Sequence, residues 1–89
     1  MLNPRIIAIS GPLQGWVFPI TEEEFTFGQD ETNQACLKDE LVSRRHCSVR
    51  VENGCVVLRD LESANGTVVN GEEIAAGGKK ILMYMDRSV

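Results

Sequence analysis

Residues 43–71 read SRRHCSVRVENGCVVLRDLESANGTVVNG and hold the three polar segments that decide the fold. The segments are Ser43–His46, Ser63–Thr67 and Val69–Gly71, and short apolar runs separate them. Short polar side chains and glycines between apolar runs are typical of the loops that join β-strands. Two adjacent arginines with nearby hydroxyl and amide groups suit a tetrahedral anion. We therefore expect one end of a β-sandwich to carry a small polar binding site.

The stretch between the first two segments has the pattern of a β-hairpin. Residues 46–52 alternate between polar and apolar side chains, which is the two-residue period of a half-buried strand. An Asn-Gly pair follows at 53–54, and this pair favours a type I′ turn because both central residues need positive φ. Cys55–Asp60 is the expected return strand. A second Asn-Gly pair at 70–71 predicts another hairpin turn between two shorter expected strands.

Short strand patterns recur along the rest of the chain. The expected strands outside the first hairpin are Arg5–Ser10, Trp16–Ile20, Glu24–Phe27, Thr67–Val69, Glu72–Ile74 and the apolar run Ile81–Met85. Residues 21–24 resemble a helix capping box, but no apolar stripe of period 3.6 follows, so a turn into a strand is the better interpretation. Many short strands with frequent turns predict an all-β sandwich of short antiparallel strands or a barrel.

Length and composition narrow the classes of function. At 89 residues, we expect one domain over residues 1–89. A hydrophobic content of 43 % is too high for a disordered chain, and a net charge of −4 argues against a general nucleic-acid or membrane-surface binder. No apolar run approaches the ~20 residues of a membrane span, and the first residues lack a secretory pattern. We expect a cytoplasmic protein.

The residue types that hold metals or form disulfides lack the spacing for either. The three cysteines are Cys36, Cys47 and Cys55. Their odd number and wide spacing argue against a disulfide framework and against zinc, so we expect buried or half-buried thiols. The acidic residues that could be proposed as a cation site are Asp30, Glu31, Asp39 and Glu40, but their spacing is not that of a calcium-binding loop. We expect no metal and no cofactor.

A catalytic interpretation of the single histidine is weak. His46 and Cys47 are neighbours on an expected strand, so their side chains point to opposite faces. Ser43 could approach His46 across a turn, which leaves a small hydrolase as an alternative, but no motif supplies oxyanion donors or a third group. We expect a structural histidine bonded to the backbone, and no enzyme activity.

In their order and spacing, these motifs resemble the forkhead-associated (FHA) domain. Supporting positions are Ile20 before Phe25–Gly28, and Asp60–Ser63 before the Asn-Gly-Thr turn; the resemblance covers about residues 5–74. It implies an eleven-stranded β-sandwich that binds phosphothreonine peptides through the loops at one end. The opening run 5–15 also looks like FHA modules at the N-terminus of bacterial enhancer-binding transcription activators.

The resemblance assigns roles residue by residue. It implies that Ser43 donates to the phosphate, that Arg44 contacts phosphate or peptide backbone, and that Asn65 bonds the peptide backbone. Ala64 falls where the family often has a side-chain donor, and Arg45 varies in the family, so its role stays open. The residues expected to brace the loops or hold turns are Gly28, His46, Gly66, Thr67, Asn70 and Gly71.

Two departures from the family pattern bear on the function. Gln29 stands where the family places a phosphate-gripping arginine after the glycine. A charge-assisted hydrogen bond contributes about 1.5–3 kcal/mol against roughly 1 for a neutral one, so we expect the phosphopeptide affinity to be roughly ten-fold lower. The family also continues with two more strands, whereas here one apolar run leads to Val89. That predicts an unpaired C-terminal edge, and hence a strand-mediated dimer, an exchanged segment or a fragment of a longer protein.

Two functions from different classes remain. The first is a phosphothreonine-peptide recognition module within a larger bacterial signalling or transcription-regulator protein, with no direct nucleic-acid or membrane binding. The second is a phospho-independent scaffold or self-association module whose phosphate site has degenerated at Gln29 and Ala64. The sequence identifies neither the partner nor its residues around the phosphate.

Overall fold

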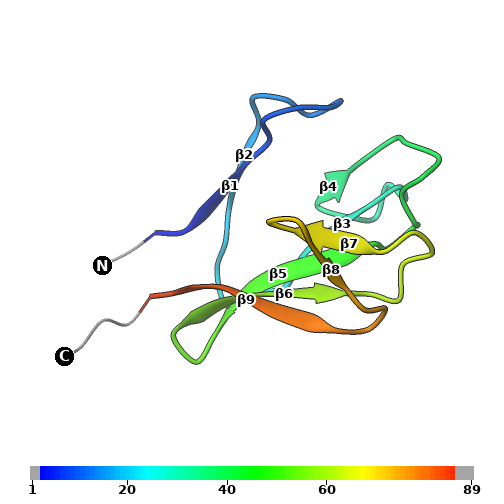
Figure 1. The fold of residues 1–89 in the computed structure, drawn as a ribbon. Coiled ribbons are helices and arrows are strands. Elements are labelled where there is room, and N and C mark those ends of the chain that lie inside the picture. The colour runs from blue at the N-terminus through cyan, green and yellow to red at the C-terminus, as the bar shows by residue number, and fades with distance from the viewer. Residues whose placement is uncertain (1–2, 86–89) are drawn as a thin grey trace.

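The computed structural model describes residues 3–85 and has nine β-strands and no helix over that range (Figure 1). The all-β prediction is therefore confirmed. The strands are β1 (Arg5–Ile7), β2 (Val17–Pro19), β3 (Phe25–Gly28), β4 (Ala35–Cys36), β5 (Cys47–Glu52), β6 (Cys55–Asp60), β7 (Thr67–Val69), β8 (Glu72–Ile74) and β9 (Lys79–Tyr84). Nothing helical in this range could cross a bilayer.

A five-stranded sheet in the order β4-β3-β5-β6-β9 forms the main layer. Its neighbours pair antiparallel except β3 and β4, which run parallel. The central β5–β6 hairpin turns where the sequence predicts it, because Asn53 and Gly54 both have positive φ, 48° and 75°. The Asn-Gly pair at 70–71 behaves alike, with φ of 51° and 80°, and joins β7 to β8.

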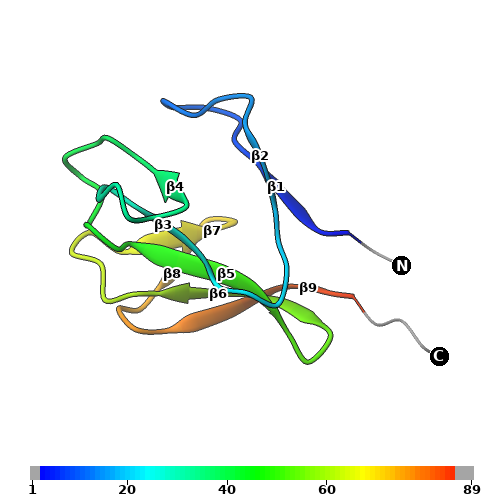
Figure 2. The same cartoon turned by 180° about the vertical axis from the view of Figure 1, so that it is seen from behind.

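Two separate two-stranded sheets, β1–β2 and β7–β8, contribute side chains to the core of the main sheet; in Figure 2, β7–β8 crosses the main sheet, whereas the β1–β2 hairpin extends beyond it. The buried centre of the core is formed by Ile20, Val49, Val56 and Leu58. Ile6 of β1 and Val69 of β7 pack against that centre from the second layer. Phe18 of β2 joins them by contacting the rings of Phe25 and Phe27, with centroids 5.3 and 5.9 Å apart.

The boundaries of several strands differ from the sequence prediction. β3 is shifted by one residue and β5 begins one residue later than predicted. β1 and β2 are shorter than predicted, because the backbone beyond them already forms the turn of the hairpin: the Ala8 carbonyl accepts from Gly15 and the Trp16 N–H donates to the Leu13 carbonyl. β4 was not predicted, since a two-residue strand leaves no periodic signal. β9 begins two residues earlier than the predicted apolar run, because Lys79 and Lys80 pair with β6. The nine strands of the described residues compare with eleven expected from the family.

Candidate functional site

Three loops meet at one end of the main sheet, on the right in Figure 1: β3–β4, β4–β5 and β6–β7. The Ser43 Oγ accepts a hydrogen bond from the backbone N–H of Ala64 at 2.9 Å. The Asn65 side chain donates to the backbone carbonyl of Leu41 at 2.8 Å. The structure therefore brings Ser43, Ala64 and Asn65 together from loops about twenty residues apart in the sequence.

Gln29 joins this cluster from the β3–β4 loop. Its backbone N–H donates to the carbonyl of Ser43 at 2.9 Å, and its side-chain Nε2 donates to the carbonyl of Asp39 at 3.1 Å. The side chain therefore ties the β3–β4 loop to the β4–β5 loop. Because a primary amide carries two N–H donors, one of them is still able to serve a ligand.

The two adjacent arginines differ in their surroundings. Arg44 is exposed beside Ser43 and forms no ion pair with any of residues 3–85. The Arg45 guanidinium lies 3.8 Å from the Glu24 carboxylate. Glu24 lies just before the start of β3, whereas the three polar loops gather near its end. The Arg45 side chain is therefore directed away from Ser43. Of the two, the structure places only Arg44 with the polar cluster.

The backbone of Arg44 explains why a glycine ends β3. The Arg44 carbonyl accepts from the Asn33 side-chain amide at 2.6 Å and from the Asp30 N–H at 3.2 Å. A Cβ on Gly28 would lie 2.1 Å from that carbonyl oxygen, so only glycine allows this close approach. Asn33 is 6 % exposed. Its supporting role could not be predicted from the sequence, because a lone asparagine in a loop looks like an ordinary turn residue.

His46 links two of the loops through both ring nitrogens. Its Nδ1 accepts from the Ser43 N–H at 3.1 Å, so the proton sits on Nε2, which donates to the Gly66 carbonyl at 2.8 Å. The prediction of a structural histidine bonded to the backbone is confirmed. Burial, aided by the charge of Asp60, raises the pKa of the Cys47 thiol to about 12, so this neighbour stays protonated and is a poor nucleophile.

Asp60, at the end of β6, anchors the β6–β7 loop and is only 2 % exposed. Its carboxylate accepts from the Ser63 N–H at 2.8 Å and from the Ser63 and Thr67 hydroxyls at 2.6 Å each, with a longer contact of 3.4 Å from the Gly77 N–H. Burial alone would raise the pKa of Asp60, but these hydrogen bonds outweigh it and lower the pKa to about 2. The sequence marked Asp60 only as part of a supporting pattern.

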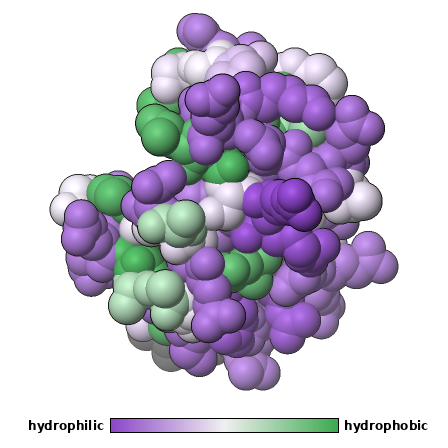
Figure 3. Space-filling view, turned by 90° about the vertical axis from the view of Figure 1, so that its right-hand side faces the viewer, coloured by the Kyte–Doolittle hydropathy of each residue, from purple (hydrophilic) through white to green (hydrophobic). Residues whose placement is uncertain are grey.

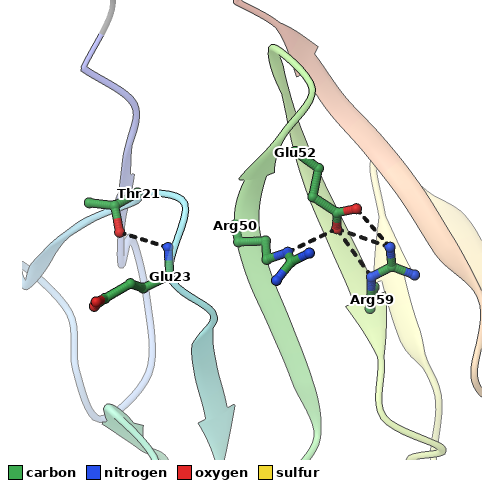
Figure 4. A network of polar contacts seen from close by, with 5 residues as sticks. All are labelled: Thr21, Glu23, Arg50, Glu52 and Arg59. Carbon is green, nitrogen blue, oxygen red and sulfur yellow. Dashed lines mark hydrogen bonds and ion pairs between the residues drawn. The ribbon is translucent and has the colours of Figure 1, made fainter.

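A second polar cluster lies on the outer face of β5 and β6, away from the loop end (Figure 4). Arg59 Nη2 contacts the Glu52 carboxylate at 2.8 Å and Arg50 Nε contacts it at 3.3 Å. The hydrogen bond from Arg59 lowers the pKa of Glu52, as do the charges of both arginines. A shallow concavity of about 340 Å³ adjoins Arg50, but Glu22 and Glu52 also line it. This balance of charge does not suit an anion.

The loop end and the second polar cluster present different groups to a ligand. Figure 3 looks onto the loop end and shows a mainly hydrophilic surface, with apolar residues gathered toward one side. The Ser43 Oγ already accepts a backbone hydrogen bond, so its own proton is left to donate outward. This hydroxyl and the exposed Arg44 are two donors of the kind that an anion requires. Asp30 is the acidic residue near them: hydrogen bonds from Thr32 lower its pKa, and the charge of Arg44 adds to this effect.

Two layers of strands around one core, with three interlocked polar loops at one end, define a β-sandwich that presents a loop-built binding surface. The chain belongs to the FHA domain family: the FHA domain model matches residues 25–87, which is more than half of the chain. The family resemblance of the sequence motifs is thereby confirmed.

The relatives include bacterial regulators. The chain is 33 % identical over 69 residues to the glycogen accumulation regulator GarA of Mycolicibacterium smegmatis, covering 78 % of this chain and 44 % of that protein. It is 31 % identical over 80 residues to the oxoglutarate dehydrogenase inhibitor of Corynebacterium diphtheriae, covering 85 % and 56 %. The chain thus spans about half the length of the curated relatives it matches.

Solved structures share the fold. The FHA domain of Chlamydia trachomatis CT664 superposes with a TM-score of 0.77 at 23 % identity, covering 88 % of this chain and 78 % of that one, and shows the fold alone. An FHA domain solved for the analysis of phosphothreonine-dependent interactions has a TM-score of 0.65 at 33 % identity, covering 78 % and 69 %. Mycobacterium tuberculosis EmbR, solved in complex with a low-affinity phosphopeptide, has a TM-score of 0.70 at 28 % identity. The match covers 78 % of this chain and 18 % of that one.

Proposed function

We propose that this chain recognises phosphothreonine peptides and so mediates a regulated protein–protein interaction without catalysis. The observation that carries the proposal is the Ser43 hydroxyl, which the Ala64 N–H holds at the loop end beside Arg44. Two similar structures were solved for phosphothreonine-dependent interactions or with a bound phosphopeptide. We place the module in the cytoplasm, within a larger bacterial signalling or transcription-regulator protein.

Each group in the site has a distinct task in this proposal. The phosphate carries a charge of about −1.5 to −2 near neutral pH. The Ser43 hydroxyl and the Arg44 guanidinium donate to its oxygens, and the arginine supplies the charge. Because the Asn65 Nδ2 is bonded to the Leu41 carbonyl, its Oδ1 accepts from a backbone N–H of the peptide. Gln29 adds one neutral donor.

The direct test is a phosphothreonine peptide library, titrated by fluorescence anisotropy beside the same peptides without phosphate. We expect binding that requires phosphate, and Ser43→Ala and Arg44→Ala each to weaken it roughly ten-fold, since a hydrogen bond to a charged group contributes about 1.5–3 kcal/mol. Arg50→Ala is the matched control, because Arg50 is an exposed arginine on the far face of β5. No binding at millimolar peptide, with Gln29→Arg also silent, would exclude the proposal.

A second candidate is a phospho-independent scaffold. The observation in its favour is the Gln29 side chain, which is engaged with the Asp39 carbonyl and brings no charge to the site. This candidate predicts equal affinity for a phosphorylated and an unphosphorylated partner. A strict phosphate requirement excludes it.

A further inference from the structure

The outer face of the main sheet carries basic side chains on three neighbouring strands. Residues of β5 alternate between the core face, which holds Val49, and this outer face, which holds Arg50. Arg59 of β6 lies on the outer face as well, and Lys79 of β9 is directly opposite Arg59. We call Arg50, Arg59 and Lys79 the basic cluster. They are three of the nine basic residues in a chain that has thirteen acidic residues and a net charge of −4.

Glu52 holds two of these cations in place. Figure 4 shows its carboxylate between the guanidinium groups of Arg50 and Arg59, which it contacts at 3.3 and 2.8 Å. Arg59 lies two residues after Val57 on β6, whereas Glu52 is opposite the residue two before it. The Arg59–Glu52 pair therefore spans Val57, which is 6 % exposed although it belongs to the outer face. Because the two arginines are already held, they lose less freedom when they bind a ligand.

These ion pairs leave several donors of both arginines available. A guanidinium group has five N–H donors. Arg50 contacts Glu52 through Nε, and Arg59 does so through Nε and Nη2. The Arg50 and Arg59 side chains are 45 % and 38 % exposed, whereas that of Glu52 is 17 % exposed. A partner therefore meets the guanidinium donors rather than the carboxylate.

Lys79 adds a positive charge without an acid opposite it. It is exposed at the start of β9 and forms no ion pair with any of residues 3–85. The residue opposite it is Arg59, and like charges in directly opposite positions are unfavourable. Glu22 lines the concavity beside Arg50, so the charge is balanced at that border of the face and unbalanced toward Lys79. A carboxylate supplied by a partner would relieve the repulsion.

We propose that the basic cluster docks an acidic segment of a partner protein, independently of the loop end. Neighbouring strands are about 4.8 Å apart, and alternate residues of an extended chain project to one side about 6.6 Å apart. An extended segment with acidic residues at alternate positions therefore matches three cations on neighbouring strands, within the reach of arginine and lysine side chains. A nucleic acid fits less well, because the acidic remainder of the chain repels its phosphates.

Fluorescence anisotropy tests the proposal with a labelled peptide of alternating glutamate and serine, beside one of alternating glutamine and serine. We expect the acidic peptide to bind with a submillimolar dissociation constant at low salt and to weaken as salt is added, and the glutamine peptide not to bind. Lys79→Glu is expected to weaken binding roughly ten-fold, since it replaces an attractive exposed pair by a repulsive one. Lys38→Glu is the matched control, because it makes the same change of charge at an exposed lysine of the β4–β5 loop, and it is expected to bind nearly like the wild type.

NMR spectroscopy of the unaltered protein keeps the test decisive if a variant unfolds. The Nε–H resonances of Arg50 and Arg59 and the amides of β5, β6 and β9 are expected to shift on titration with the acidic peptide. No binding at millimolar peptide, equal weakening by Lys38→Glu, or shifts confined to the three polar loops would each overturn the proposal. An oligothymidylate that binds this face more tightly than the peptide would overturn it as well. Phosphopeptide binding that persists in Lys79→Glu would support the independence of the basic cluster from the loop end.

Discussion

The β6–β7 loop and the β4–β5 loop frame the same site but are held by different chemistry. The first is anchored by the buried Asp60 carboxylate, which receives charge-assisted hydrogen bonds from Ser63 and Thr67. The second is held by neutral contacts, from the His46 ring and from the Asn33 amide. The proposed phosphate donors Ser43 and Arg44 lie on the second loop, whereas Asn65 of the first loop is proposed to contact the peptide backbone. We therefore expect the anchor of the first loop to act mainly on stability, and the second loop mainly on phosphate recognition. Substitutions in each should separate the two properties.

Asp60→Ala is the strongest test of this division. It leaves two hydroxyls and a backbone N–H at the β6–β7 turn without their acceptor. Leaving buried polar groups unsatisfied costs about 1–3 kcal/mol each, so we expect a loss of roughly 3 kcal/mol in the free energy of unfolding. Urea unfolding measures it, and Glu73→Ala, at an exposed acid on β8, is the control. An unchanged midpoint would show that Asp60 does not anchor the loop.

Acid should weaken the same anchor in a defined window. The pKa of Asp60 is lowered to about 2 in the folded state from an ordinary value of 3.8. A depressed pKa contributes stability that is complete above the unfolded value and is lost as the pH falls through the folded value. We therefore expect roughly 2 kcal/mol to disappear between about pH 5 and pH 2. Urea unfolding across that range measures the loss, and Asp60→Asn should flatten the profile.

Gly28→Ala probes the neutral loop instead. The new Cβ would lie 2.1 Å from the Arg44 carbonyl oxygen and 2.7 Å from the Asn33 amide nitrogen, so the β4–β5 loop must move. We expect a loss of about 1–2 kcal/mol, toward the low end of overpacking costs because a loop can shift. Phosphopeptide affinity should fall in the same variant, since Ser43 and Arg44 move with the loop. Lost stability with full affinity would contradict the division between the loops.

The local features of the fold were predictable from the sequence, because turn chemistry and strand period act over a few residues. The two Asn-Gly turns and the β5–β6 hairpin required only nearest neighbours. β4 was not predictable, since its two residues pair in parallel with β3 through a loop that has no periodic pattern. The separation of β1–β2 from β7–β8 likewise depends on contacts across the core rather than on either hairpin.

The site shows the same limit. The family resemblance assigned Ser43 and Asn65 to the binding site, and the structure brings their two loops together; the single histidine was expected to bond the backbone, as it does. The roles of Asn33 and Asp60 could not be predicted, because each depends on hydrogen bonds to other loop residues. Asn33 donates to the Arg44 carbonyl, and Asp60 accepts from the Ser63 and Thr67 hydroxyls. The direction of Arg45 depends on Glu24, which is distant in sequence. Side-chain direction and burial emerge only once the loops interlock.

Gln29→Arg has the smallest expected effect and tests the positive charge that the β3–β4 loop lacks beside the neutral β4–β5 loop. An arginine at this position adds a charged donor beside Ser43, and exchanging a neutral for a charge-assisted hydrogen bond should raise phosphopeptide affinity roughly ten-fold. The protein also loses the exposed Gln29–Asp39 hydrogen bond, so its stability should change little. Calorimetric titration with a phosphothreonine peptide measures the gain.

The control for this gain is Gln14→Arg, which adds the same charge at the exposed tip of the β1–β2 hairpin. A general electrostatic effect on an acidic domain would raise affinity equally in both variants, and it would weaken with added salt for both. A gain confined to Gln29→Arg places the phosphate within reach of the β3–β4 loop. If neither variant gains, the ligand does not carry its charge to this end of the sheet, and the polar loops serve a partner that needs no phosphate.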